Sequence, residues 1–157
     1  LIAEAAGVNE VTLFRKYGSK AELVAAAVLH ERQSLEIESV TYTGDLAADI
    51  LAIVEAYTHA SYRQSSLIML IMADMTRYPE LSAVMKVPLM LVSHFGEIIA
   101  RYQREGRLRR EEPLLVVGAL LGPVIVNRML HTAAPDLPLP EIDTVKHVEQ
   151  FLHGFAT

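Results

Sequence analysis

The sequence predicts an all-α protein, with an N-terminal helix-turn-helix followed by a helical bundle. Three observations predict this fold class. Apolar residues recur every three or four positions through most of the chain, as they do along the buried side of a helix. Glycines, prolines and capping residues divide the chain into helix-sized segments, and no segment alternates as a strand with hairpin turns does. Hydrophobic residues make up 52% of the 157 residues, which is enough for a sizeable core.

Composition and charge exclude several classes of function. The chain has no cysteine, which excludes disulfides and metal–thiolate sites and fits a cytoplasmic protein. The longest apolar stretch, residues 114–126, is shorter than the ~20 residues of a membrane span, so we expect no membrane partner. The net charge is −5, but residues 1–35 hold four Lys or Arg and four Glu. Because salt screens charges beyond ~8 Å, a local basic edge can still bind an anionic partner.

The N-terminal segment is predicted to be helix, turn, helix, turn, helix. Residues 1–6 are rich in Ala and Glu and form the first helix, which ends at the sharp turn of Gly7. Asn9 is predicted to cap the second helix, residues 10–17, because its side-chain oxygen can accept free N–H groups of the first turn. Gly18 ends this helix. Such a short helix, held at a steep angle between two glycine turns, suits insertion into a DNA major groove.

The short helix 10–17 has a polar and an apolar side. It exposes three polar side chains, Thr12, Arg15 and Lys16. Four apolar or aromatic side chains can pack inward: Val11, Leu13, Phe14 and Tyr17. Ser19 and Glu22 have the spacing of a capping box and are predicted to begin a long helix that runs to residue 38.

The middle of the chain is predicted to form three helices after a connector at residues 41–44. Residues 45–62 are amphipathic, and residues 67–72 are apolar all round, which predicts a separate helix buried in the bundle. The next helix is predicted to begin at Pro79 and run to Arg104, with a kink or break at Pro88.

The last third of the chain is predicted to contain two more helices, 112–131 and 142–155, separated by a proline-rich loop at 133–140. Gly118 and Gly122 place small residues four apart, so another helix can approach closely. The remaining circumference of helix 112–131 is also apolar and needs a cover, which favours a dimer over a helix that is central in its own subunit. Gly106 is predicted to end the preceding helix. The five arginines around it favour a solvated helix end over a second DNA contact; they are Arg101, Arg104, Arg107, Arg109 and Arg110.

Three stretches resemble the helix-turn-helix of the TetR (tetracycline-repressor-like) transcriptional regulators. They are I-A-E-A-A-G-V at 2–8, T-L-F-R-K-Y at 12–17 and S-K-x-E-L at 19–23. R-Y-P-E-L at 77–81 and R-E-G-R-L-R-x-E-E-P at 104–113 are similar, more weakly, to the regulatory domain of that family. Phe14 stands where the family usually has Tyr, and Tyr17 stands where Phe is common. The family's first helix would precede Leu1, so we expect this sequence to be N-terminally incomplete.

The resemblance implies two domains, a helix-turn-helix domain with its connecting helix at 1–38 and a ligand-binding and dimerisation domain at 39–157. Residues implied to contact DNA are Asn9, Glu10, Val11, Thr12, Phe14, Arg15, Lys16, Tyr17 and Lys20. Residues implied to line a ligand pocket are Tyr57, Tyr62, Met69, Met72, Met90, His94 and Phe95. Methionines at helical spacing are equally ordinary core residues, and His94 fits a buried, hydrogen-bonded imidazole as well as a ligand contact.

The dimer interface is predicted to use the last two helices, as the last two helices of TetR-type subunits do. The residues are Gly118, Leu121, Gly122, Ile125, Met129, Val148, Phe151, Leu152 and Phe155.

The function implied is a ligand-responsive, DNA-binding transcriptional regulator, most simply a repressor. It would bind a palindromic operator in double-stranded DNA as a homodimer and be released by a small, largely apolar effector. No catalytic motif, phosphate loop or metal-ligand spacing occurs, so we expect no enzyme activity, no cofactor and no metal. The alternative is a helical, dimeric interaction or small-molecule-binding module without effective DNA binding.

Overall fold

The computed structural model describes residues 7, 9–19, 22, 23, 26, 39–75, 79, 82 and 85–157. Within its helices, the side chains of residues 10, 14, 60–74, 86–88 and 91 are outside this description. The predicted helix 1–6, most of the predicted helix 19–38 and the predicted burial of 67–72 therefore lie outside the described residues.

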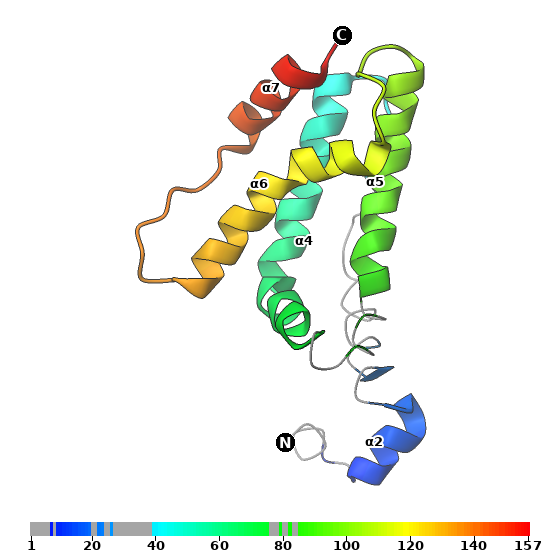
Figure 1. The fold of residues 1–157 in the computed structure, drawn as a ribbon, viewed down its shortest axis with the longest axis vertical. Helices are drawn as coiled ribbons and strands as arrows, with labels where there is room; N and C mark the ends of the chain where they lie inside the picture. Colours follow the sequence, from blue (N-terminus) through cyan, green and yellow to red (C-terminus); the bar gives the residue numbers. More distant parts are fainter. Residues whose placement is uncertain are drawn as a thin grey trace.

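The described residues form five helices, which confirms the all-α prediction (Figure 1). They are α2 (Glu10–Tyr17), α4 (Leu46–Met75), α5 (Lys86–Arg104), α6 (Pro113–Ala133) and α7 (Thr144–Phe155). The predicted bounds of α2 are confirmed, and α6 and α7 differ from prediction by one or two residues at their ends. One isolated bridge pairs Leu108 with Ala156 and holds the end of the chain against the α5–α6 loop.

Helix α4 is one continuous helix of 30 residues, whereas the sequence predicted two. The residues between the two predicted segments contain neither glycine nor proline, so nothing local ends the helix there. The apolar stretch 67–72 is therefore the distal part of the same helix.

Helix α5 begins at Lys86, later than predicted. Pro79 lies in a short 3-10 turn ahead of it. Pro88 occupies the third position of α5, where the backbone N–H that proline lacks would have no partner within the helix. The predicted kink at Pro88 is therefore wrong, because a proline in the first turn does not interrupt the hydrogen bonds of the helix. The alternative prediction, that Pro88 bounds a break, agrees with a helix that begins two residues before it. The predicted end of the helix is confirmed: α5 ends at Arg104, and Gly106 follows with a positive φ of 71°.

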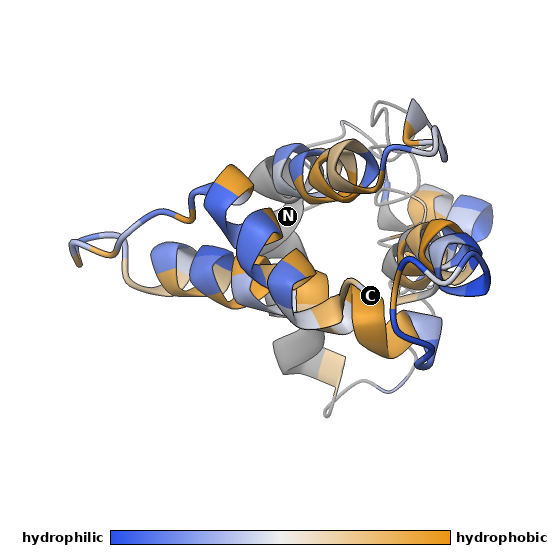
Figure 2. Ribbon diagram, turned by 90° about the horizontal axis from the view of Figure 1, so that it is seen from above, coloured by the Kyte–Doolittle hydropathy of each residue, from blue (hydrophilic) through white to orange (hydrophobic). Residues whose placement is uncertain are grey.

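The core lies where α6 packs against both α4 and α5, with α7 packed on α4. Seen from above, the helices carry separate hydrophobic and hydrophilic sides (Figure 2). The buried side chains with no exposure at all come from α4, α5 and α6, and include Ile50, Ile53, Phe95, Ile99 and Leu120. Gly96 of α5 permits the close approach of α6, because a Cβ there would lie 3.3 Å from Leu114 Cδ2.

Helix α6 is long and apolar enough to cross a membrane by length and composition alone. It extends seven residues beyond the apolar stretch 114–126, which is itself shorter than a membrane span. Core helices of soluble proteins share these properties, and one side of α6 is buried against the bundle through Val116, Val117, Leu120 and Leu121. Pro123 lies inside the helix, and Figure 1 shows α6 changing direction along its length, as a proline that removes one backbone hydrogen bond would cause.

Candidate nucleic-acid interface

The start of α2 is held by its predicted cap. The backbone N–H of Val11 donates to Asn9 Oδ1 at 2.9 Å, and the N–H of Thr12 donates to the Asn9 carbonyl at 2.9 Å. Gly7 precedes this cap with a positive φ of 64°, a backbone conformation that favours glycine. A helix of only eight residues has little stability of its own, so this cap matters for its position.

The end of α2 is set by a glycine turn and by half of a capping box. Gly18 has a positive φ of 78°, and the N–H of Glu22 donates to Ser19 Oγ at 3.1 Å. The reciprocal bond of a full capping box does not form, because the N–H of Ser19 donates to the Tyr17 carbonyl at 3.0 Å. The Glu22 carboxylate lies over Gly18, where it would contact any Cβ. The two turns therefore fix both ends of α2.

The exposed side of α2 carries Val11, Thr12, Arg15 and Lys16, while Leu13 and Tyr17 are half-buried. Val11 is 72% exposed, so the prediction that it packs inward is wrong. Its position explains this, because Val11 and Arg15 are four residues apart and lie on the same side of the helix. Lys16 Nζ lies 5.1 Å from the centre of the Tyr17 ring, and its charge remains at the surface.

Three of the predicted DNA contacts cannot be placed: the side chains of Glu10 and Phe14, and all of Lys20, lie outside the described residues. The other predicted contacts belong to α2 or to its Asn9 cap, and α2 lies at one end of the molecule (Figure 1). The α5–α6 loop, which carries the arginine-rich segment, lies at the opposite end (Figure 1). An exposed basic helix of this size fits the major groove, where side chains meet phosphates and base edges.

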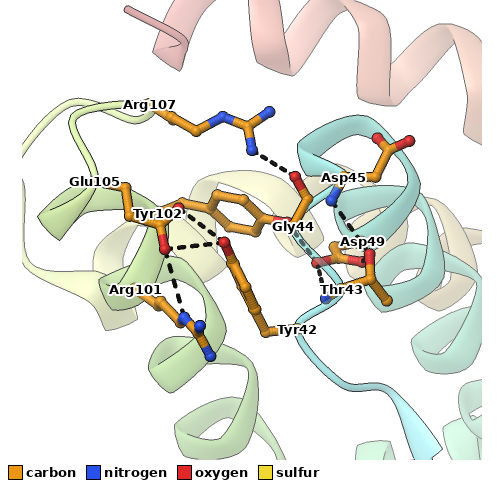
Figure 3. A network of polar contacts seen from close by, with 9 residues as sticks. All are labelled: Tyr42, Thr43, Gly44, Asp45, Asp49, Arg101, Tyr102, Glu105 and Arg107. Atoms are coloured by element: carbon orange, nitrogen blue, oxygen red, sulfur yellow. Dashed lines mark hydrogen bonds and ion pairs between the residues drawn. The ribbon is translucent and has the colours of Figure 1, made fainter.

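A polar network anchors the connector 39–45 at the far end of the bundle (Figure 3). Asp49 of α4 is only 2% exposed and accepts hydrogen bonds from the Thr43 N–H at 2.8 Å, the Thr43 hydroxyl at 2.5 Å and the Tyr102 hydroxyl at 2.5 Å. Burial by itself raises the pKa of Asp49, but these donors outweigh burial and hold the pKa below its ordinary value. Burial and the bond to Asp49 raise the pKa of Tyr102. At neutral pH the Asp49 carboxylate is therefore charged and the Tyr102 hydroxyl is neutral.

The outer half of the same network joins the connector to α5. The Tyr42 hydroxyl donates to both carboxylate oxygens of Glu105, at 2.8 and 2.9 Å, which raises the pKa of Tyr42. The guanidinium of Arg101 lies 3.6 Å from the centre of the Tyr42 ring and 3.5 Å from Glu105. Arg107 donates to the Gly44 carbonyl at 2.6 Å. Sequence reasoning missed this network, although Asp49 is a carboxylate on the otherwise apolar stripe of α4, a signal visible in the sequence.

The predicted pocket residues are only partly described. Phe95 has no exposure and belongs to the core, Met90 is 55% exposed, and Tyr57 is half-buried with a pKa raised by burial. His94 Nε2 lies 2.8 Å from the Val40 carbonyl oxygen. Because a carbonyl oxygen can only accept a hydrogen bond, Nε2 carries the proton, and the bond ties α5 to the connector. The side chains of Tyr62, Met69 and Met72 lie outside the described residues. The pocket therefore stays a prediction.

A small cavity of ≈ 80 Å³ opens elsewhere, between α4, α6 and the segment before α7. None of the predicted pocket residues lines it. Its lining is Thr58, Val124, Asn127, Arg128, His131, Glu141, Ile142 and Thr144. Within the described part of the chain, no three His, Asp or Glu side chains are grouped closely enough to hold a metal ion.

The predicted interface residues fall into two groups. Leu121, Val148 and Phe151 are at most 7% exposed and already covered within the chain. Gly118 is exposed, and a Cβ added at Gly118 or Gly122 would meet nothing within 4 Å. The others are half-buried: Gly122, Ile125, Met129, Leu152 and Phe155.

Helix α6 also exposes large apolar side chains that sequence reasoning did not single out. Leu115 is 69% exposed, Val126 54% and Leu130 49%. With Gly118 and Gly122 they follow a spacing of three and four residues, so they form one stripe on the side of α6 away from the core. That spacing was readable in the sequence, but nothing local shows which side of an all-apolar helix is covered.

Known proteins resemble this chain in sequence at its start and in fold throughout. Residues 1–27 match the family model described as "Bacterial regulatory proteins, tetR family". A search of curated proteins gives no match. The solved structure of the Flavonoid-responsive Regulator FrrA is similar with a TM-score of 0.72 and 20% identity, over 99% of this chain and 84% of that one. A Mesorhizobium loti MAFF303099 protein described as a TetR-family transcriptional regulator is similar with a TM-score of 0.75 and 18% identity, over 99% and 85%.

Proposed function

We propose that the chain is a ligand-responsive transcriptional regulator, supported by the match of residues 1–27 to the tetR family model and by the similarity of its fold to two regulators of known structure. In this proposal it binds a palindromic operator as a homodimer, acts as a repressor in the cytoplasm, and is released by a small, largely apolar effector.

The exposed basic side of α2 carries the proposal for DNA binding. Arg15 and Lys16 stand exposed in the last turn of an eight-residue helix that is capped at one end and stopped by a glycine turn at the other. Arg15 is the candidate base reader, because its guanidinium can bond guanine O6 and N7 together. Lys16 can neutralise a phosphate, which positions the helix without reading sequence.

The exposed stripe of α6 supports the homodimer. Leu115, Val126 and Leu130 place apolar surface beside Gly118 and Gly122, whose missing side chains let a second helix approach. A two-fold axis through this stripe would bring the same stripe of a second subunit against it and cover the apolar surface.

The proposed effector is a small aromatic molecule. One protein of similar fold is named as flavonoid-responsive, and an aromatic, largely apolar molecule of that kind fits a bundle rich in Met and Tyr. Such a molecule could change DNA affinity only through unequal affinity for the DNA-bound and free conformations.

The test is to select duplexes from a random pool with the full-length protein and measure affinity for the selected operator over a range of salt concentrations. We expect affinity to fall with rising salt as phosphate contacts are lost. Arg15→Ala should cost about 1–3 kcal/mol and relax the preference at one base pair of each half-site, whereas Lys16→Ala should weaken all sequences alike.

Two outcomes would contradict parts of this proposal. If Arg15→Ala weakened every sequence equally, Arg15 would be a phosphate contact and not a base reader. Absence of any salt-dependent DNA affinity would instead favour a dimeric interaction or ligand-binding module.

A further inference from the structure

Val11 exposes an apolar side chain to solvent, which is unfavourable unless another molecule covers it. It is 72% exposed, more than Leu115 or any other exposed large hydrophobic residue of the described chain. It is the second residue of α2, directly after the Asn9 cap, so its backbone is fixed by the bond from its own N–H to Asn9 Oδ1. A valine side chain in a helix keeps essentially one rotamer, so its two methyl groups point in one fixed direction.

The neighbours of Val11 indicate what it faces. Thr12 is exposed beside it, and Arg15, one turn further along the same side, is exposed as well. The Arg15 guanidinium and the apolar Val11 side chain, four residues apart, do not together match a phosphate backbone, which offers only charged oxygens. They match the floor of a major groove, where a guanine offers O6 and N7 and a thymine offers its C5-methyl group.

The place of Val11 along α2 supports the same partner. In helix-turn-helix proteins, the N-terminal residues of the recognition helix contact base edges in the major groove. Val11 is the second residue of α2, and Arg15, on the same side one turn later, is long enough to reach a base edge beside it.

We propose that Val11 reads the C5-methyl group of a thymine in each operator half-site, close to the base contacted by Arg15. This inference rests on the proposed function, since it assigns a base preference to the same helix. The Val11 methyls would contact the thymine methyl and exclude water from both, so the contact selects thymine without any hydrogen bond.

The experiment replaces each operator thymine in turn by deoxyuridine, which keeps the O4 acceptor and loses only the methyl group. The full-length protein is compared with Val11→Ala by measuring affinity for both duplexes. For the wild type, one position in each half-site should lose about fourfold in affinity per half-site, as expected for one buried methyl group. For Val11→Ala, the thymine and deoxyuridine duplexes should bind equally.

Val145→Ala is the matched control, because Val145 is also the second residue of its helix and is 52% exposed. It should keep the full discrimination between thymine and deoxyuridine. The inference is overturned if no position discriminates, or if Val11→Ala discriminates as the wild type does. It is also overturned if Val11→Ala lowers the melting temperature by several degrees and leaves discrimination intact, because protein would then cover Val11. Loss of all sequence-selective, salt-dependent binding in the wild type would instead remove the proposed function.

Discussion

At the scale of single residues, Asp49 shows how a buried carboxylate is kept charged. Thr43 donates two hydrogen bonds to it and Tyr102 donates a third, from a position 53 residues away in the chain. The folded protein therefore holds the pKa of Asp49 below its value in the unfolded chain. A carboxyl with a lowered pKa contributes stability that is present above its unfolded pKa and is lost as pH falls through its folded pKa.

Tyr102→Phe should lower the free energy of unfolding at pH 7 by about 1.5–3 kcal/mol, because a buried carboxylate loses one donor. Urea denaturation measures this change. The difference from the wild type should stay constant from neutral pH to about pH 5 and shrink as the pH falls below about 4, the ordinary pKa of Asp, toward the lowered pKa of Asp49 in the folded protein.

Tyr42→Phe is the matched control. It removes the same hydroxyl from a ring whose centre lies 4.8 Å from that of Tyr102, but the lost bond goes to the exposed Glu105. The Arg101 guanidinium can still lie over the phenylalanine ring. Equal destabilisation by the two substitutions would show that burial of Asp49 does not decide the energy of its hydrogen bonds.

At the scale of helices, α6 combines a buried side, an exposed apolar side and a proline bend. Its exposed side contains Gly118 and Gly122, where a side chain would meet nothing in the same subunit. A glycine inside a helix costs about 1 kcal/mol relative to alanine, and close approach of a second helix would offset that cost for both glycines. In the proposed dimer that neighbour is the second subunit.

Gly122→Leu should dissociate the dimer, because a leucine would hold the two helices apart and overpack the contact by about 1–3 kcal/mol. Sedimentation over a range of protein concentrations measures the change. Within one subunit the leucine has open space and a better helix propensity than glycine, so α6 itself should remain folded.

Gly122→Ala is the conservative partner of this test and should keep most of the dimer. A Gly122→Leu protein that sediments as the wild type, with an unchanged melting temperature, would place α6 outside the interface.

At the scale of the whole molecule, the two basic regions lie at opposite ends. Helix α2 occupies one end, and the loop between α5 and α6 occupies the other (Figure 1). Arg101 and Arg104 lie in the last turn of α5, and Arg107, Arg109 and Arg110 lie in this loop. Several of these arginines already have partners in the chain: Arg101 lies by Glu105, Arg107 bonds the Gly44 carbonyl, and Arg109 lies over the Phe155 ring. From this arrangement we expect the second cluster to support the fold and to make no contact with the DNA that α2 is proposed to bind.

The double substitution Arg104→Gln with Arg110→Gln should therefore leave operator affinity and its salt dependence unchanged, since both side chains are exposed at the end remote from α2. Lys16→Gln, which removes one charge from α2, should reduce the slope of log affinity against log salt by about one per subunit. Titrations of one operator at several salt concentrations compare the two proteins. A reduced slope in the arginine variant would make that cluster a second DNA contact.

The sequence by itself determined where most helices begin and end. Asn9, Gly18, Gly106 and Pro113 act through bonds and backbone angles that involve residues at most a few positions away, so their effects are readable locally. The family motif at the start of the chain is local in the same sense, and both it and the all-α fold were predictable.

Only the tertiary structure decided which surfaces are covered. Burial depends on contacts between residues far apart in the chain, and no local pattern contains them. Val11 is an apolar residue, yet its side chain is exposed. Asp49 is a charged residue, yet it is buried, because Tyr102 of another helix donates a hydrogen bond to it. The same reason separates Leu121 from Leu115: both are leucines of one apolar helix, and only the packing of α4 and α5 against one side of it makes the first core and leaves the second exposed.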